Sequence, residues 1–186
     1  MQVPETIKLQ GGALSLDFAN SADWTEDGEP IEDALVEPDS LERWGRRVGV
    51  AAPAGEHELA AARELRPALR AVLIAAAHGD TPDPAARDLL LSTYAEAVAA
   101  ARLSPRDGAY VLDWAGDDPR RVRFAVTADA IALLADADRL QRIHVCPGRN
   151  CGWLFLNKSG RQRWCSMATC GSRAKMRAMY ARQQAA

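Results

Sequence analysis

All four cysteines of this 186-residue chain lie between positions 146 and 170. They form two pairs along the chain, Cys146 with Cys151 and Cys165 with Cys170, and four residues lie between the two cysteines of each pair. Thirteen residues lie between the second cysteine and the third. Zinc prefers four thiolates in a tetrahedron at about 2.3 Å, and two such pairs can supply this geometry without a large enclosing core. We therefore expect one structural zinc site formed by Cys146, Cys151, Cys165 and Cys170.

Other uses of these cysteines stay open from the sequence alone. Disulfides form in oxidising compartments, but the first residues, MQVPETIKLQGG, lack the basic and apolar regions of a signal peptide, so we expect a cytoplasmic protein. Composition does not separate zinc from iron–sulfur ligation. His144, two residues before Cys146, could replace one ligand, although four thiolates already complete a zinc site.

Charge divides the chain near the same place. Residues 139–186 carry 10 Lys and Arg residues and no Asp or Glu, whereas residues 1–138 carry 13 basic and 25 acidic residues, which gives +10 and −12. This asymmetry is typical of a basic segment that faces a polyanion, and we expect contact with DNA. The cations expected at the nucleic acid are Arg149, Lys158, Arg161, Arg163, Arg173, Lys175 and Arg177.

The same cations could instead dock on the acidic body or mediate contact with a protein partner. From Cys146 onward, six arginines stand against two lysines, which favours bidentate contact with phosphate. Docking predicts cations turned inward against the body. Nucleic-acid contact predicts a cationic face open to solvent.

The apolar periodicity of residues 1–142 predicts an acidic, mostly helical domain, so that the whole chain belongs to the α+β class. Within the long helix over 56–78, Pro67 should cause a kink or a break. Residues 109–126 show strand alternation around a Gly-Asp-Asp-Pro turn and predict a β-hairpin. Thr127 is then expected to cap the last helix of this domain.

Residues 143–186 are expected to form a small basic module that is stabilised by zinc. Strands over 153–156 and 161–164 would pair across a turn, and a helix would run from Ser172 to about residue 183. Its apolar stripe of Met176, Met179 and Tyr180 should anchor this helix. About forty residues bury too little apolar surface to fold without the metal.

Several classes of function lack support in the sequence. The chain has no G-x-S-x-G elbow, no P-loop lysine motif and no H-E-x-x-H, so we expect no enzymatic activity. The longest aliphatic run, 71–77, is too short to cross a bilayer. Asp17 and Asn20 are polar residues inside the apolar segment LSLDFAN. They could form a hydrogen-bonded turn, or a pocket through which the N-terminal domain senses a ligand or partner.

The string WLFLNKSGRQRWCSMATCGSRAKMR resembles the CGNR zinc finger, whose Cys-Gly-Asn-Arg signature begins here at Cys170. The resemblance spans residues 146–182 and implies that the four cysteines are zinc ligands and that Arg173 is the signature arginine. Two positions depart from the pattern. Ser172 stands where the signature has Asn, and Asn157 stands where Asp is expected before the basic turn.

The segments GGALSLDFANS at 11–21 and LERWGRRVGV at 41–50 resemble the ABATE domain, which usually precedes this finger. The order of the two parts in the chain agrees with that arrangement. The combined resemblance implies a bacterial transcription regulator that responds to stress. Its parts would be an ABATE-like domain over 1–142 and a finger over 143–186.

Overall fold

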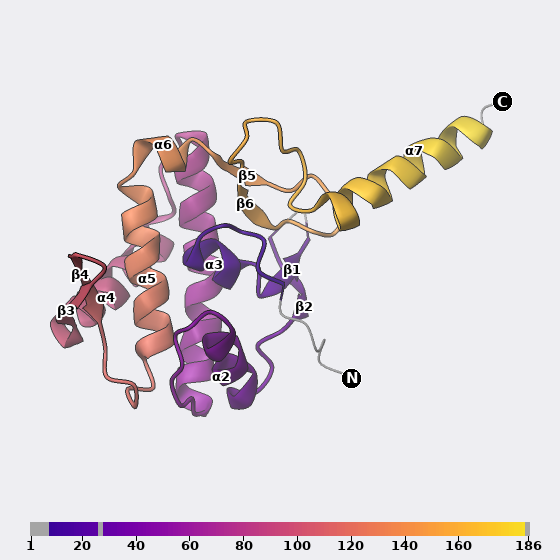
Figure 1. Ribbon diagram of the computed structural model, residues 1–186. Coiled ribbons are helices and arrows are strands. Elements are labelled where there is room, and N and C mark those ends of the chain that lie inside the picture. Colours follow the sequence, from indigo (N-terminus) through magenta and orange to yellow (C-terminus); the bar gives the residue numbers. More distant parts are fainter. Residues whose placement is uncertain (1–7, 26–27, 185–186) are drawn as a thin grey trace.

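The computed structural model describes residues 8–25 and 28–184 (Figure 1). Its helices are α1 (Leu14–Ala19), α2 (Pro38–Arg47), α3 (Glu56–His78), α4 (Pro84–Ala100), α5 (Arg121–Leu134), α6 (Ala137–Leu140) and α7 (Ser172–Gln184), with a π-helical turn η1 (Met167–Gly171) before α7. Its strands form three antiparallel pairs: β1 (Ala22–Trp24) with β2 (Pro30–Asp33), β3 (Arg102–Arg106) with β4 (Ala109–Asp113), and β5 (Ile143–Val145) with β6 (Leu154–Leu156). The predicted α+β class, mostly helical with small hairpins, is confirmed.

The long helix α3 lies at the centre of the body. Its side chains Leu65, Leu69 and Leu73 are buried in one core with side chains of α1, α2, α4 and α5. Pro67 does not split the helix, which runs through it to His78. Even α3 is too short or too polar to cross a membrane, and the same holds for every other helix in the described ranges.

The predicted hairpin over residues 109–126 is wrong in its second strand. β4 pairs instead with β3, the strand before it. The two strands turn at Asp107 and Gly108, which both have positive φ angles of 51° and 80°. An Asp-Gly pair favours this tight two-residue turn, so the hairpin closes before the region in which the turn was expected.

Strand-like alternation after residue 121 arises because α5 is buried on two sides. Val122 and Val126 contribute to the main core, whereas Phe124 packs against Trp114 in a second, smaller core. A helix that is buried on both sides can imitate the period of a strand over a few residues. Thr127, predicted as a cap, lies inside α5, where its hydroxyl donates to a carbonyl four residues earlier.

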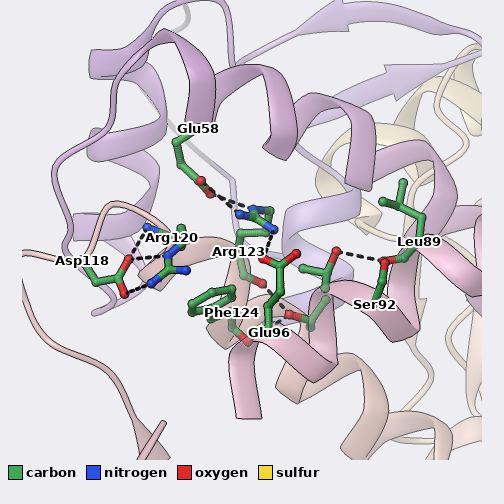
Figure 2. Close-up of polar contacts among 10 residues, drawn as sticks. Glu58, Leu89, Ser92, Glu96, Asp118, Arg120, Arg123 and Phe124 are labelled. Carbon is green, nitrogen blue, oxygen red and sulfur yellow. Dashed lines mark hydrogen bonds and ion pairs between the residues drawn. The ribbon is translucent and has the colours of Figure 1, made fainter. Parts of the chain in front are cut away.

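An ion-pair cluster joins α3, α4 and α5 (Figure 2). Arg123 of α5 donates two hydrogen bonds to the carboxylate of Glu58 of α3, at 2.9 and 3.3 Å, and both residues are buried. A third guanidinium nitrogen of Arg123 lies 3.7 Å from the carboxylate of Glu96 of α4. Loss of either buried partner would leave an uncompensated charge, so the cluster fixes how the three helices pack.

The second predicted hairpin, with strands over 153–156 and 161–164, is also wrong. β6 pairs with β5, which precedes it, and residues 161–164 form no strand. The loop that joins the two strands therefore contains the first two cysteines.

The β5–β6 pair belongs to the core of the body. Ile143, Leu154 and Leu156 are buried together with the side chains of α3. Asn20, which follows α1, donates its amide hydrogen to the Leu154 carbonyl and accepts from the Leu154 N–H, both at 2.8 Å. The Leu156 N–H donates to the Gly11 carbonyl at 2.9 Å. The cysteine-rich segment is thus joined to the body through β6, whose main chain is hydrogen-bonded to Asn20 and Gly11.

Replacement of Asn20 by alanine leaves two buried main-chain groups of Leu154 without partners, each at a cost of about 1–3 kcal/mol. We expect Asn20→Ala to lower the free energy of unfolding of the zinc-loaded protein by about 2–4 kcal/mol, as measured by urea denaturation. Ser92→Ala removes an exposed hydroxyl that bonds only to the Leu89 carbonyl of its own helix, so this control should change stability by less than about 0.5 kcal/mol. Equal losses in the two variants would contradict this role of Asn20.

Candidate metal centre

The four cysteine sulfurs converge on one buried point. Their Sγ atoms all lie within 4.8 Å of one another, and all four side chains are buried and outside disulfides. The Sγ of Cys165 lies 3.7 Å from that of Cys151 and 3.8 Å from that of Cys170. Thiolates about 2.3 Å from a central zinc ion would have edges of about 3.8 Å in a tetrahedron, so this sulfur cage fits zinc.

Two turns and one glycine shape the cage. Cys146 and Cys151 lie in the β5–β6 loop, whereas Cys165 precedes η1 and Cys170 lies within it. The Cys165 N–H donates to the Cys146 Sγ at 3.5 Å, which orients this ligand. Gly148 packs so closely on the cage that an added Cβ would lie 2.9 Å from the Cys170 Sγ. Any side chain at position 148 would therefore displace a ligand.

Because the sulfurs lie so close together, the pKa values of the cysteine thiols shift in opposite directions. Hydrogen bonds from the side chains of Cys151 and Cys165 lower the pKa of Cys146, whose thiolate they stabilise. The hydrogen bond to that thiolate, together with burial, raises the pKa of Cys151 and of Cys165. Four thiolates can therefore share the cage only when a bound cation offsets their charge, as Zn²⁺ does.

The histidine considered as an alternative ligand is engaged elsewhere. His144 is exposed on β5 and stacks on Phe155, with the ring centroids 5.9 Å apart. Phe155, Trp153 and Trp164 pack around the sulfurs. Four protein sulfurs in an apolar shell leave no open position for a water molecule or a substrate, which is the arrangement of a structural zinc site.

Two family models match the chain. The ABATE model, described as "Putative stress-induced transcription regulator", matches residues 12–137, and the CGNR zinc finger model matches residues 142–183. The chain belongs to the ABATE family. Both resemblances found in the sequence are confirmed, and the sulfur cage is the structural zinc site of a CGNR finger. No curated protein matches the chain.

The two departures from the CGNR pattern occupy turns of the finger. Asn157 is buried, and its side-chain oxygen accepts a hydrogen bond from the Gln162 N–H at 3.0 Å. A carboxylate oxygen could accept the same bond, so Asn can replace Asp here. The Ser172 hydroxyl donates to the Met167 carbonyl at 3.0 Å, which closes the turn that enters α7.

The cations predicted to contact nucleic acid are all exposed on the CGNR finger. One lies in the β5–β6 loop, three follow β6 and three belong to α7. Within residues 8–25 and 28–184, none of them forms an ion pair with a carboxylate. In the order of the chain, these cations are Arg149, Lys158, Arg161, Arg163, Arg173, Lys175 and Arg177.

The last helix, α7, extends away from the ABATE domain (Figure 1). The expected anchoring of Met176, Met179 and Tyr180 is wrong, because all three side chains are exposed. The helix continues directly from η1. The direction of α7 is therefore set by this turn, which contains Cys170, and not by packing of α7 on the body. Arg173, Met176, Arg177 and Tyr180 instead line an open groove of about 490 Å³ along η1 and α7.

The polar pair of the ABATE domain has partners within the protein. The Asp17 carboxylate accepts a hydrogen bond from the Gly11 N–H at 2.7 Å, and burial raises the pKa of this carboxyl. Asn20 uses both ends of its amide on Leu154. The ligand pocket at Asp17 and Asn20 stays a prediction.

Sequence reasoning missed a contact that fixes the finger on the body. The main-chain N–H of Trp24 donates to the Cys151 carbonyl at 3.2 Å. Arg70 lies 4.7 Å from the centre of the Trp24 ring and donates to the Gly152 carbonyl at 3.2 Å. Gly152 has a φ of +58°, and an added Cβ would lie 2.8 Å from the Cβ of Trp24. The sequence feature that could have indicated this contact is Gly152, the glycine that directly follows the ligand Cys151.

The Cys165 sulfur contacts two other ligand sulfurs, so Cys165→Ser should open the cage. We expect this variant to lose the bound zinc and to exchange amide hydrogens rapidly over 146–153 and 157–171. The amides of α3 should stay protected, because the main core does not include those loops. Elemental analysis and hydrogen-exchange mass spectrometry measure the two effects.

Ser166→Ala is the neighbouring control and should keep one zinc ion per chain. A Cys165→Ser protein that retains zinc, or that keeps slow exchange over 157–171, would show that the cage does not hold this segment.

Proposed function

We propose that this protein is a bacterial, cytoplasmic transcription regulator whose CGNR finger binds DNA and whose ABATE domain senses a small ligand or a protein partner. The observation that carries DNA binding is the exposure of seven cations, none of them ion-paired with a carboxylate of the described residues, on a module that zinc holds in shape. Five of the seven are arginines, whose guanidinium groups bind phosphate with two parallel hydrogen bonds. The two family descriptions name a regulator and a zinc finger, and the proposal includes no catalytic step.

The distribution of charge supports contact through the finger. The segment after Asp138 contains no acidic residue, whereas the part before it has a net charge of −12. The field of such a molecule repels DNA from the body and attracts it to the finger, which orients the first encounter. Because α7 extends beyond the body, a duplex can approach its cations without contacting the acidic surface.

The short helix α1 is the element through which the ABATE domain would act on the finger. It carries Asp17 and is followed by Asn20, which bonds to β6 next to the metal-binding loop. A ligand or partner that shifts α1 would therefore move β6 and change the position of the finger on the body.

A purely structural role of the zinc module is the second candidate. It is favoured by the burial of the β5–β6 pair in the main core and by the close packing of Gly152 on Trp24. In this role zinc would stabilise the whole protein, and the exposed cations would have no specific partner. A DNA-binding measurement separates the two candidates.

Binding of a short labelled DNA duplex, followed by fluorescence anisotropy across a salt series, tests the proposal. The zinc-loaded protein should bind at low salt, with log K falling by about 0.9 per neutralised phosphate for each decade of salt. The double variant Arg173→Ala/Arg177→Ala should reduce this slope by about 1.8. The control Arg47→Ala/Arg106→Ala removes the same charge from exposed positions of the ABATE domain and should leave the slope unchanged.

Absence of binding by the zinc-loaded wild type at low salt would contradict DNA binding and leave the structural candidate. Equal effects of the two double variants would show that net charge, rather than the finger, determines the affinity.

A further inference from the structure

The last helix, α7, presents a stripe of uncharged side chains between two rows of cations. With about 100° between successive residues, the side chains at positions 176, 179, 180 and 183 share one face of the helix. These residues, called the α7 stripe below, are Met176, Met179, Tyr180 and Gln183. The first three are 46%, 39% and 54% exposed, so the described residues leave the stripe uncovered.

Cations border the α7 stripe on both sides. Arg173 and Arg177 lie about 70° and 110° from its centre in one direction. Lys175 and Arg182 lie about 90° and 110° from its centre in the other direction. All four are exposed, and the helix has no acidic residue to pair with them. Because like charges four residues apart destabilise a helix, a bound polyanion would relieve the repulsion between Arg173 and Arg177.

The face of α7 opposite the stripe is small and uncharged. It consists of Ala174, Ala178 and Ala181. Cations whose only role was solubility would have no reason to avoid this face, because solubility needs charge spread over the whole surface. Their restriction to the two borders of the stripe indicates two negatively charged surfaces, one on each side of the helix.

Two phosphate backbones with uncharged base edges between them form the major groove of B-form DNA. This groove is about 12 Å wide and admits an α-helix, whose diameter with side chains is about 10–12 Å. A helix in the groove places its inner face against the base edges and its two sides against the phosphates of the two strands. The side chains around α7 follow the same order, with an uncharged face between two cationic borders.

The chemistry of the α7 stripe favours A·T pairs. A glutamine forms two hydrogen bonds with N6 and N7 of adenine, and apolar side chains contact the 5-methyl group of thymine. Gln183 can supply the first contact, and Met176 and Met179 can supply the second. From position 176 to position 183 the helix rises about 10 Å, which is the length of about three base-pair steps.

The position of α7 leaves the stripe accessible to a duplex. Figure 1 shows the helix projecting from the finger, with its C-terminal end directed away from the helices of the ABATE domain. No side chain of α7 is buried. At the start of the helix, Met176 and Tyr180 line the open surface groove beside η1, so the described residues leave this end of the stripe open as well.

We propose that α7 lies in the major groove of B-form DNA, with the α7 stripe against the base edges of A·T pairs. The four cations of the helix then contact the phosphates of both strands. This inference rests on the proposed binding of DNA by the finger, and it adds the helix, the groove and the class of base pair.

Filling the major groove tests the position of the helix. Three labelled duplexes of one mixed sequence serve as probes: ordinary DNA, DNA with a glucosylated 5-hydroxymethyl group on every cytosine, and RNA. The glucose fills the major groove and leaves the phosphates and the minor groove unchanged, whereas side chains cannot read the deep, narrow major groove of A-form RNA. By fluorescence anisotropy, the full-length, zinc-loaded protein should bind both altered duplexes at least about tenfold more weakly than ordinary DNA.

Substitutions in α7 test the stripe itself. Met176→Ala/Met179→Ala keeps all four cations, so the salt dependence of log K should stay that of the wild type while the affinity falls about tenfold. Replacement of thymine by uracil removes only the 5-methyl group, and it should weaken wild-type binding about threefold or more without affecting this variant. Ala178→Gln/Ala181→Gln, on the opposite face, is the matched control and should bind as the wild type does. All four positions are exposed, so circular dichroism should not change.

The outcomes separate this inference from the proposed function. Equal affinities for ordinary DNA and for either altered duplex would overturn the placement of α7 in the major groove and leave DNA binding by the finger intact. Wild-type affinity of the methionine variant, or weakened binding by the alanine control, would also overturn this placement. A uracil duplex that binds as tightly as the thymine duplex would overturn the contact with A·T pairs. Absence of binding to ordinary DNA would contradict the proposed function and this inference together.

Discussion

Four thiolates around one zinc ion hold a segment that has too little apolar surface to fold by itself. Apart from the side chains that β5 and β6 bury in the body, the buried apolar contacts of the finger consist of the sulfurs and a few aromatic rings. Structural zinc contributes about 10–16 kcal/mol of apparent binding free energy, which is comparable to the stability of a whole domain. The cage also sets the direction of α7, because Cys170 lies in the turn from which that helix continues.

The ABATE domain gives this cage a fixed position. β5 and β6 pack in the main core, and the loop between them contains the first two ligands. Asn20 and Trp24 form hydrogen bonds with the main chain on either side of Gly152. At this junction the finger offers main-chain groups to Asn20, Trp24 and Arg70 of the body, and its own predicted DNA-contacting cations form no ion pair with the described carboxylates. This separation explains how one chain can keep an acidic body and a cationic surface in contact without neutralising either.

Features that depend on local chemistry could be predicted from the sequence. The cysteine spacing, the charge division and the strings around Cys165 and Cys170 led to the zinc site and to the family. The two hairpins were mispredicted for different reasons. β6 pairs with β5 across the loop that contains the first two cysteines, a pairing that the residues next to β6 do not reveal. Residues 121–126 were taken for a strand because Phe124 faces a second core on the other side of α5 from the main core, and the Asp-Gly turn that closes β3 on β4 was overlooked. The exposure of Met176 and Tyr180 could not be predicted either, since an amphipathic stripe does not reveal whether another element covers it.

The zinc coordination is the feature on which the shape of the finger and the exposure of its cations depend. X-ray absorption at the zinc edge, on the full-length protein purified without added metal, measures it most directly. One zinc ion per chain with four sulfur neighbours at about 2.3 Å is the predicted result. Nitrogen or oxygen neighbours in place of sulfur, or a folded protein that contains no zinc, would contradict it.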